Sequence, residues 1–221
     1  MTPTRLNQPG AIEARWPAML AIAGVLVLLA LLPARVRLFP SWAPYITGMG
    51  LILPMAGTWL SGGDARWRRV ERVTTLAFSL LAEMVTLMTL AYLIREMLAR
   101  PEDFTGIQLF TSSVGAWVTN VLAFSLVYWW MDCGGPDARA NGSDAKPDWL
   151  FPQSGMGEAA PADWRPTYAD YLFVAFTAAA AFSPADALPL TRRAKLLTMV
   201  ESTVSLATLV VVASRAIGLL G

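Results

Sequence analysis

The side chains best able to do chemistry lie in the apolar stretch 195–220. At 100° per residue, its polar residues fall within an arc of about 140°, and they are Thr198, Glu201, Ser202, Ser205, Thr208 and Arg215. A polar stripe on a hydrophobic helix either lines a wet pathway or packs against polar neighbours. The first alternative predicts Thr198, Glu201, Ser202, Ser205 and Thr208 as pore-lining residues, and the second makes them contacts between helices.

A carboxylate, Glu83, lies near the middle of a second apolar stretch, Val70–Leu98. It shares one helical face with Arg72, Thr75, Ser79 and Thr86, which are spaced by three or four residues. An acid inside a membrane is costly and is a functional candidate by default, so Glu83 is predicted as an intramembrane functional acid. The alternative is a structural ion pair, for example with Arg215.

Composition places these residues in a membrane protein. The 221-residue chain is 55% hydrophobic and only 15% charged, whereas a soluble domain carries about 25% charge. With no histidine and one cysteine, the sequence excludes zinc sites, histidine-based triads and intrachain disulfides. We expect no cofactor, no metal, no nucleic-acid partner and, lacking a nucleophile with a paired base, no enzymatic activity.

Five stretches approach the roughly 20 apolar residues that a membrane span needs. They are Trp16–Leu32, Trp42–Leu60, Val70–Leu98, Ile107–Met131 and Lys195–Leu220. The first is interpreted as a retained span and not a secretory signal, because its apolar run is long and no small-residue cleavage site follows it. We expect an all-α integral membrane protein with a single membrane domain, 1–221, whose first three spans occupy 1–106.

Two segments separate the fourth span from the fifth. Residues 132–167 are polar and rich in glycine, and predict a surface loop. The segment 168–182 predicts a helix, but its apolar part, Tyr171–Phe182, has 12 residues, which is too short to span. Short apolar runs of this kind are re-entrant or buried. We expect a re-entrant half-helix at 168–182, a turn at 183–194 and an inner helix at 195–220.

This region resembles the pore-loop module of potassium channels, without gaps, over roughly 107–220. Phe176 and Thr177 match the end of a pore helix, and the residues that match the region after the filter are Asp186, Pro189, Thr191 and Lys195. The resemblance implies a channel-like pore module at 107–221, with the outer helix at 107–131. It also implies a homo-oligomer, of which a tetramer is the first expectation, and an inorganic ion as partner.

The filter itself departs from the potassium-channel pattern. The residues in that place are Ala181, Phe182, Ser183, Pro184, Ala185 and Asp186. Potassium filters use glycines to turn successive carbonyls toward the ion, and here both glycines are missing while Pro184 fixes a backbone angle. The sequence therefore predicts ion permeation without potassium selectivity of the usual type. The alternative is a non-conducting structural or regulatory protein that keeps the pore scaffold.

The chain is also similar, over nearly its whole length, to a bacterial family of uncharacterised membrane proteins. Those proteins couple a segment of the pattern Tyr-x-Asp-Tyr/Phe-Leu, here Tyr168–Leu172, to a final apolar helix. This resemblance implies a multi-pass protein of the bacterial inner (plasma) membrane.

Basic residues fall unequally on the two sides of this predicted topology. Five are on one side: Arg35, Arg37, Arg95, Arg100 and Arg215. The other twelve of the 17 are on the side of the N-terminus and the polar loop: Arg5, Arg15, Arg66, Arg68, Arg69, Arg72, Arg139, Lys146, Arg165, Arg192, Arg193 and Lys195. The positive-inside rule places the twelve in the cytoplasm, which is opposite to the orientation of potassium channels.

Overall fold

The computed structural model describes most of the chain. For 96–99, 106–109 and 212–220 it describes the backbone only; the described residues are 13–32, 40, 42–99, 106–142, 145–156, 164–181 and 187–220. The fold is mostly helical, at 82%. The long helices are α1 Trp16–Leu31, α2 Ala43–Leu60, α3 Ala65–Ala99, α4 Gly106–Met131 and α7 Arg192–Leu220. Each lies within a few residues of a stretch expected from the sequence.

Three of these helices are long and apolar enough to cross a membrane. Within the described residues the three segments are Ala65–Arg95 in α3, Phe110–Gly134 in α4 and Arg192–Val211 in α7. At 1.5 Å per residue, the 35 residues of α3 extend about 52 Å, which exceeds a hydrocarbon core of about 30 Å.

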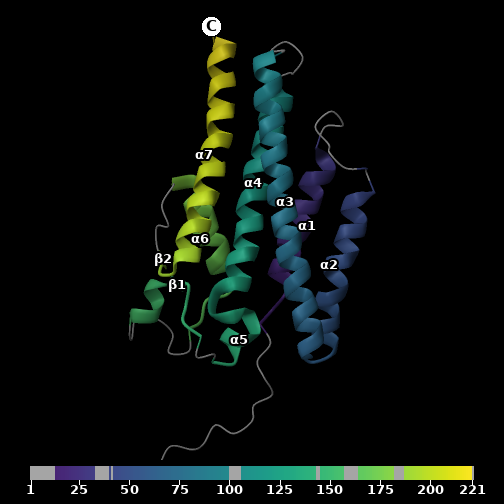
Figure 1. The fold of residues 1–221 in the computed structure, drawn as a ribbon, viewed down its shortest axis with the longest axis vertical. Helices are drawn as coiled ribbons and strands as arrows, with labels where there is room; N and C mark the ends of the chain where they lie inside the picture. Colours follow the sequence, from purple (N-terminus) through teal and green to yellow (C-terminus); the bar gives the residue numbers. More distant parts are fainter. Residues whose placement is uncertain are drawn as a thin grey trace, which may run out of the picture.

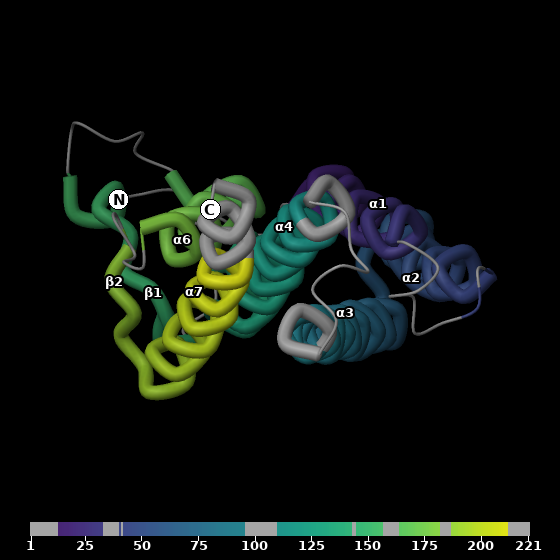
Figure 2. The backbone as a smooth tube through the Cα atoms, turned by 90° about the horizontal axis from the view of Figure 1, so that it is seen from above, coloured from purple at the N-terminus to yellow at the C-terminus, as the bar shows by residue number. Residues whose placement is uncertain are grey.

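Helix α4 lies in the middle of the bundle. It packs against α1 and α3 on one side and against α6 (Tyr168–Ala181) and α7 on the other (Figures 1 and 2). The packed face of α1 is made of small and branched side chains, including Ala18, Ala21 and Val25. Large apolar side chains on the outer faces, such as Leu20, Leu80 and Met199, are more than half exposed. An apolar exterior of this extent fits a helix bundle surrounded by lipid.

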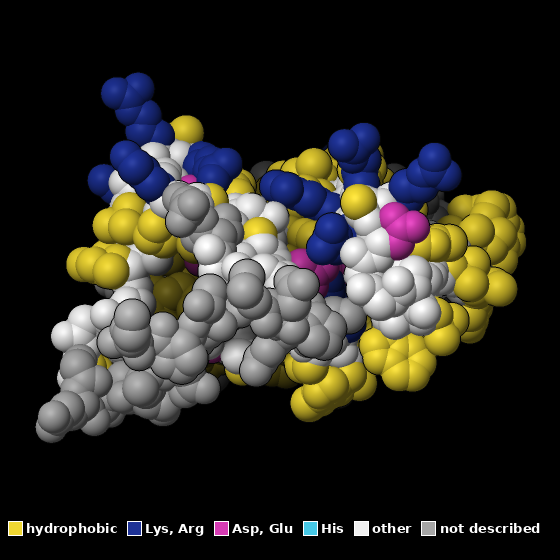
Figure 3. Space-filling view, turned by 90° about the horizontal axis from the view of Figure 1, so that it is seen from below, with side chains coloured by type: hydrophobic (Ala, Val, Ile, Leu, Met, Phe, Trp, Pro, Cys, Tyr) yellow, Lys and Arg dark blue, Asp and Glu magenta, His cyan; other side chains and the backbone are white. Residues whose placement is uncertain are grey.

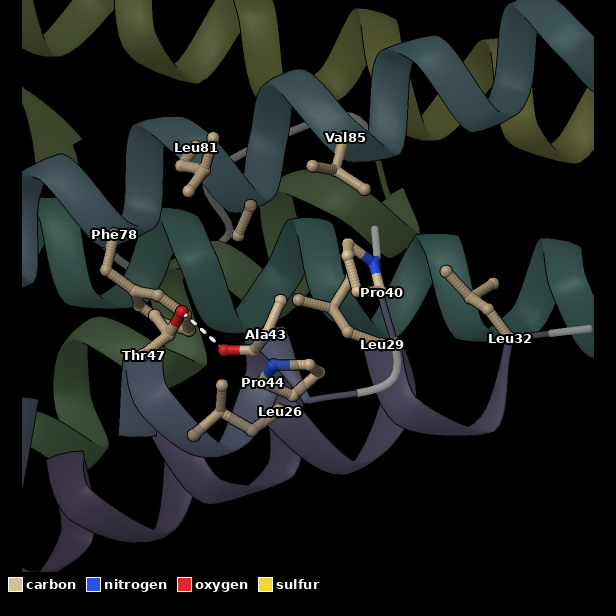
Figure 4. A pocket seen from close by; sticks show the side chains of 11 residues that line it. Leu26, Leu29, Leu32, Pro40, Ala43, Pro44, Thr47, Phe78, Leu81 and Val85 are labelled. Carbon is tan, nitrogen blue, oxygen red and sulfur yellow. Dashed lines mark hydrogen bonds between the residues drawn. The ribbon is translucent and has the colours of Figure 1, made fainter. Parts of the chain in front are cut away.

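Helices α2 and α3 form a hairpin beside α1. The turn is fixed by Asp64, whose carboxylate accepts the backbone N–H of Arg66 at 2.9 Å and caps the start of α3. An apolar pocket of about 50 Å³ lies between α1, α2 and α3 (Figure 4). Its Thr47 hydroxyl donates to the carbonyl of Ala43 at 2.9 Å. This pocket therefore offers a ligand almost no free polar group.

Short elements close the lower end of the bundle in Figure 1. In chain order they are η1 Asp132–Gly134, α5 Pro136–Ala140, β1 Trp149–Leu150, η2 Pro152–Gly155 and, after α6, β2 Leu188–Pro189. The two strands pair antiparallel, with Trp149 opposite Pro189 and Leu150 opposite Leu188. The chain leaves α4 through Cys133, Gly134 and Gly135, which all have positive φ.

The expectation that 132–167 is a surface loop is wrong for much of this segment. Asp132, Asp148 and Trp149 are at most 1% exposed, and Asp137 and Arg139 are also buried. The polar side chains are inside because they pair with one another and with the helix ends. Sequence polarity alone does not reveal that pairing.

Candidate functional site

Buried polar side chains join α4 to α7 inside the bundle. The Tyr128 hydroxyl donates to Glu201 Oε2 at 2.5 Å. The Asn120 amide donates to Ser205 Oγ at 2.9 Å and to the backbone carbonyl of Glu201 at 3.2 Å. All four side chains are fully buried. They form a hydrogen-bonded polar cluster between two apolar helices.

Glu83 brings a second carboxylate to this cluster from α3. It is 9% exposed, and its charge lies close enough to interact with Glu201 and Tyr128. Neither of its oxygens has a hydrogen-bond partner among the described residues, and Glu201 Oε1 and Asn120 Oδ1 are also unpartnered there. Four buried acceptor oxygens thus lack a donor. We define Glu83, Asn120, Tyr128, Glu201 and Ser205 as the carboxylate cluster.

The chemistry of the carboxylate cluster follows from these open acceptors. Burying an ionised carboxylate without a donor costs several kcal/mol, so the group takes a proton or a cation. Protonation would make the Glu83 carboxyl group a hydrogen-bond donor. The other unpartnered acceptors of the cluster are Glu201 Oε1 and Asn120 Oδ1. No group of three or more metal-binding side chains occurs among the described residues. The cluster therefore suits a proton or a monovalent cation better than a divalent metal.

The residues predicted to line a pore lie inside the chain's own packing. Thr198, Glu201, Ser205 and Thr208 are 0–7% exposed, and Ser202 donates to the carbonyl of Ala178 in α6 at 3.0 Å. The exposed face of α7 is apolar and includes Leu196, Met199, Leu206 and Val210. The polar stripe thus faces α4 and α6, which is the second of the two alternatives that the sequence left open.

The polar face predicted on α3 is also turned inward. The buried residues of this face are Thr75, Ser79, Glu83 and Thr86. Arg72, two turns from the start of α3, is half-buried. Ser79 and Thr86 donate to the carbonyls four residues earlier, as hydroxyls in apolar helices commonly do. Glu83 has no ion-pair partner among the described side chains, and the side chain of Arg215 lies outside them.

The described residues at the two ends of the segment 168–190 lie at the same end of the bundle. The Tyr171 hydroxyl, in the first turn of α6, donates to Asp132 Oδ2 at 2.5 Å. The backbone N–H of Asp148 donates to Asp132 Oδ1 at 2.6 Å, and that of Leu190 donates to the carbonyl of Asp148 at 2.8 Å. Figure 1 shows α6 rising beside α7 and β2 back at the lower end. We call residues 168–190 the hairpin segment.

Asp148 fixes the returning strand of the hairpin segment to the start of α7. The Arg193 guanidinium donates to both of its carboxylate oxygens, at 2.8 and 2.7 Å. Thr191 donates to it as well, at 2.5 Å. Because Asp148 is fully buried, these donors supply the compensation that its charge requires.

A network of ion pairs fixes the lower end of α1 to α3, α4 and α5. Arg15 donates to Glu71 at 3.2 Å and to Asp137 at 2.7 Å. Arg139 contacts Glu13 at 3.3 Å, and Glu13 accepts the Trp129 indole N–H at 2.7 Å. Burial raises the pKa of Glu13, although Arg139, Trp129 and Arg15 act in the opposite direction. We interpret this network as structural, since each of its acids is paired with an arginine.

The predicted pore-helix residues lie near the far end of α6. Phe176 is 48% exposed and meets the Trp117 ring edge-on, with centroids 5.8 Å apart. Thr177 is buried and donates to the carbonyl of Val174 at 3.0 Å. Ala181 is the exposed last residue of the helix. The other predicted filter positions, Phe182, Ser183, Pro184, Ala185 and Asp186, lie outside the described residues.

Sequence reasoning missed four residues on which these arrangements depend. Tyr128 lies among aromatic residues at the end of the fourth apolar stretch, and nothing in that context marks it as the donor to Glu201. Asp132 and Asp148 looked like loop acids, and Tyr171 looked like an apolar helix residue. The signal available was the Tyr-x-Asp-Tyr-Leu pattern, since Tyr168 shares a hydrogen bond with Ser125 and Tyr171 bonds Asp132.

Comparison of the chain with protein-family models, with curated proteins and with solved structures finds no match.

Proposed function

We propose that this chain is a channel-like, multi-pass membrane protein that lets an ion through without potassium selectivity of the usual type. In this proposal α1, α2, α3, α4 and α7 span the membrane, and the hairpin segment is re-entrant. The chain sits in the inner (plasma) membrane of a bacterium, with the arginine-rich end in the cytoplasm.

The observation that carries the proposal is the shared anchor of the hairpin segment. Asp132 bonds Tyr171 at its start, and Asp148, itself bonded to Asp132, bonds Leu190 at its end. The 14 residues of α6 rise about 21 Å, which is less than the hydrocarbon core. A helix that stops inside a membrane is tolerated where protein or water covers its end, and half-helices of this kind direct a terminus toward ions.

The carboxylate cluster supports a path inside each chain. The polar face of α7 packs against α4, and its outer face is apolar, so an axial pore lined by the Glu201 stripe would need α7 to rotate. Within the present packing, an ion would instead pass between α3, α4 and α7, beside Glu83 and Glu201. Assembly into a homo-oligomer, with a tetramer as the first expectation, would then cover apolar faces such as that of Met199.

Cation flux into liposomes that contain the purified protein tests the proposal. We expect flux in the parent protein and its loss in Glu83→Gln and Glu201→Gln, because the two amides keep the shape but lose the charge. Ser205→Ala should reduce flux, whereas Thr203→Ala, on the exposed face of the same helix, should not. Equal flux in all four variants would contradict a path through the cluster.

A specific observation favours the second candidate, a non-conducting structural or regulatory membrane protein. The bonds from Tyr128 to Glu201 and from Asn120 to Ser205 close the interface between α4 and α7 directly. Absence of flux above that of empty liposomes, from protein that remains folded, would select this candidate.

A further inference from the structure

A cavity of about 550 Å³ opens at the lower end of the bundle, between the start of α3 and the turn that follows α4. Arg68, Arg69 and Arg72 line it from α3. Trp130, from the last turn of α4, lines it on the other side. This cavity, which we call the arginine pocket, is separate from the carboxylate cluster and from the hairpin segment.

The charge in the arginine pocket is largely uncompensated. None of its three arginines forms an ion pair with a described acid, and the hydrogen bond of Arg72 to the carbonyl of Gly134 is long, at 3.5 Å. Asp137 is the one acid among the described residues that line the pocket. It is already paired with Arg15 at 2.7 Å. The pocket is therefore positive.

The six-membered ring of Trp130 lies against Gly135 in the lining of the same pocket. Its side chain is 4% exposed, yet its Nε1 has no hydrogen-bond partner among the described residues. A buried indole N–H without an acceptor is uncommon, because leaving it unpaired costs about 1–3 kcal/mol. The indole N–H groups of Trp117 and Trp149 are likewise unpartnered among the described residues, so the pocket's recognition chemistry comes from its arginines.

The ligand chemistry follows from these donors and from where they lie. Guanidinium groups match the oxygens of a phosphate, to which they can donate two hydrogen bonds at once. Lys and Arg side chains gather on this end of the molecule (Figure 3). This is the end at which α3 and α4 would leave the membrane. We propose that the arginine pocket binds a phosphate group, as carried by the headgroup of an anionic phospholipid or by a free phosphate.

The test measures binding to the full-length protein in detergent, through the rise in unfolding temperature and through titration. The probes are phosphatidylglycerol, phosphatidylcholine and inorganic phosphate. The pocket variant replaces Arg68, Arg69 and Arg72 with Gln. Its matched control replaces Arg66, Arg192 and Lys195, which are exposed bases of the same end outside the pocket lining, with Gln.

The expected result is that phosphatidylglycerol binds the parent protein at least roughly tenfold more tightly than phosphatidylcholine. The pocket variant should lose this preference, and the control should keep it. Stabilisation by inorganic phosphate at millimolar concentration, absent from the pocket variant, would support the same site with a soluble ligand. Equal losses in the pocket variant and the control would overturn the proposal.

Discussion

The Tyr128 hydroxyl and the Glu201 carboxylate meet at 2.5 Å, where α4 crosses α7. Both side chains are fully buried, and the second oxygen of Glu201 has no donor among the described residues. The interaction thus gives a buried acid the hydroxyl donor that it needs. It explains how a carboxylate is accommodated in the middle of an apolar helix pair.

Replacement of Tyr128 by Phe should therefore destabilise the protein by about 1–3 kcal/mol, because Glu201 then keeps no side-chain donor. Thermal unfolding in detergent measures the change. Combining Tyr128→Phe with Glu201→Leu should cost less than the sum of the single changes, since no unpaired acceptor remains. Strictly additive costs would show that the two groups do not interact.

Arg193 and Arg192 are adjacent exposed bases, and replacing each should affect the stability of the protein differently. Arg193→Met should destabilise the start of α7 by about 1–2 kcal/mol, because Asp148 loses a bidentate partner while Thr191 remains. The loss of stability is small because the Arg193 side chain is 58% exposed, and solvent screens its charge. Arg192→Met, which removes the same charge one residue away, should change the unfolding temperature little. Equal effects would contradict the role of Asp148 as the anchor.

The pH dependence of stability should contain a contribution from Glu13. Burial raises its pKa above the ordinary value of 4.5, so the folded protein holds this proton more tightly than the unfolded chain does. The contribution is therefore favourable below pH 4.5, falls as the pH rises toward the folded-state pKa, and is constant above it. Unfolding of the parent and of Glu13→Gln, compared across this range, isolates the effect. A stability difference that does not change with pH would contradict the shift.

Two glycines of the lower end should respond differently to alanine. Gly135 has φ of 106° and ψ of 176°, and an added Cβ would meet the Trp130 ring at 3.1 Å. Gly142 has φ of 70° and open space around it. Gly135→Ala should cost about 2–3 kcal/mol and Gly142→Ala about 1 kcal/mol, as measured by unfolding. The reverse order would contradict the positive φ of Gly135 and its close approach to the Trp130 ring.

The helices were readable from the sequence because long apolar runs have few alternatives. The positions of Glu83 and Glu201 on inward faces also followed from their spacing, since polar groups in such helices turn toward one another. What the spacing could not decide was whether the Glu201 stripe faces water or protein. That depends on the partner helix, and Tyr128 and Asn120 carried no sign of their pairing.

The lower end of the bundle was not predictable from local patterns. Asp132 and Asp148 are ordinary turn residues by type, and their burial depends on Tyr171, Thr191 and Arg193, which are more than 35 residues away in the chain. Long-range pairing of this kind leaves no periodicity. The same holds for the arginine pocket, where α3 meets a turn more than 60 residues further on.

The hairpin segment is the centre of this account, and its sidedness can be measured. Cys133, the one cysteine, has φ of 50°, so Cys133→Gly gives a compatible cysteine-free background. Single cysteines then replace Thr167 and Leu188, which are exposed at the two ends of the segment. Ser61 and Pro40, at opposite ends of α2, serve as references for the two sides.

Labelling of intact cells and of inverted vesicles with a membrane-impermeant maleimide gives the answer. A re-entrant segment predicts that positions 167 and 188 are labelled from the same side, together with position 61 and opposite to position 40. Labelling of 167 and 188 from opposite sides would show that the segment crosses the membrane and would contradict the channel-like proposal.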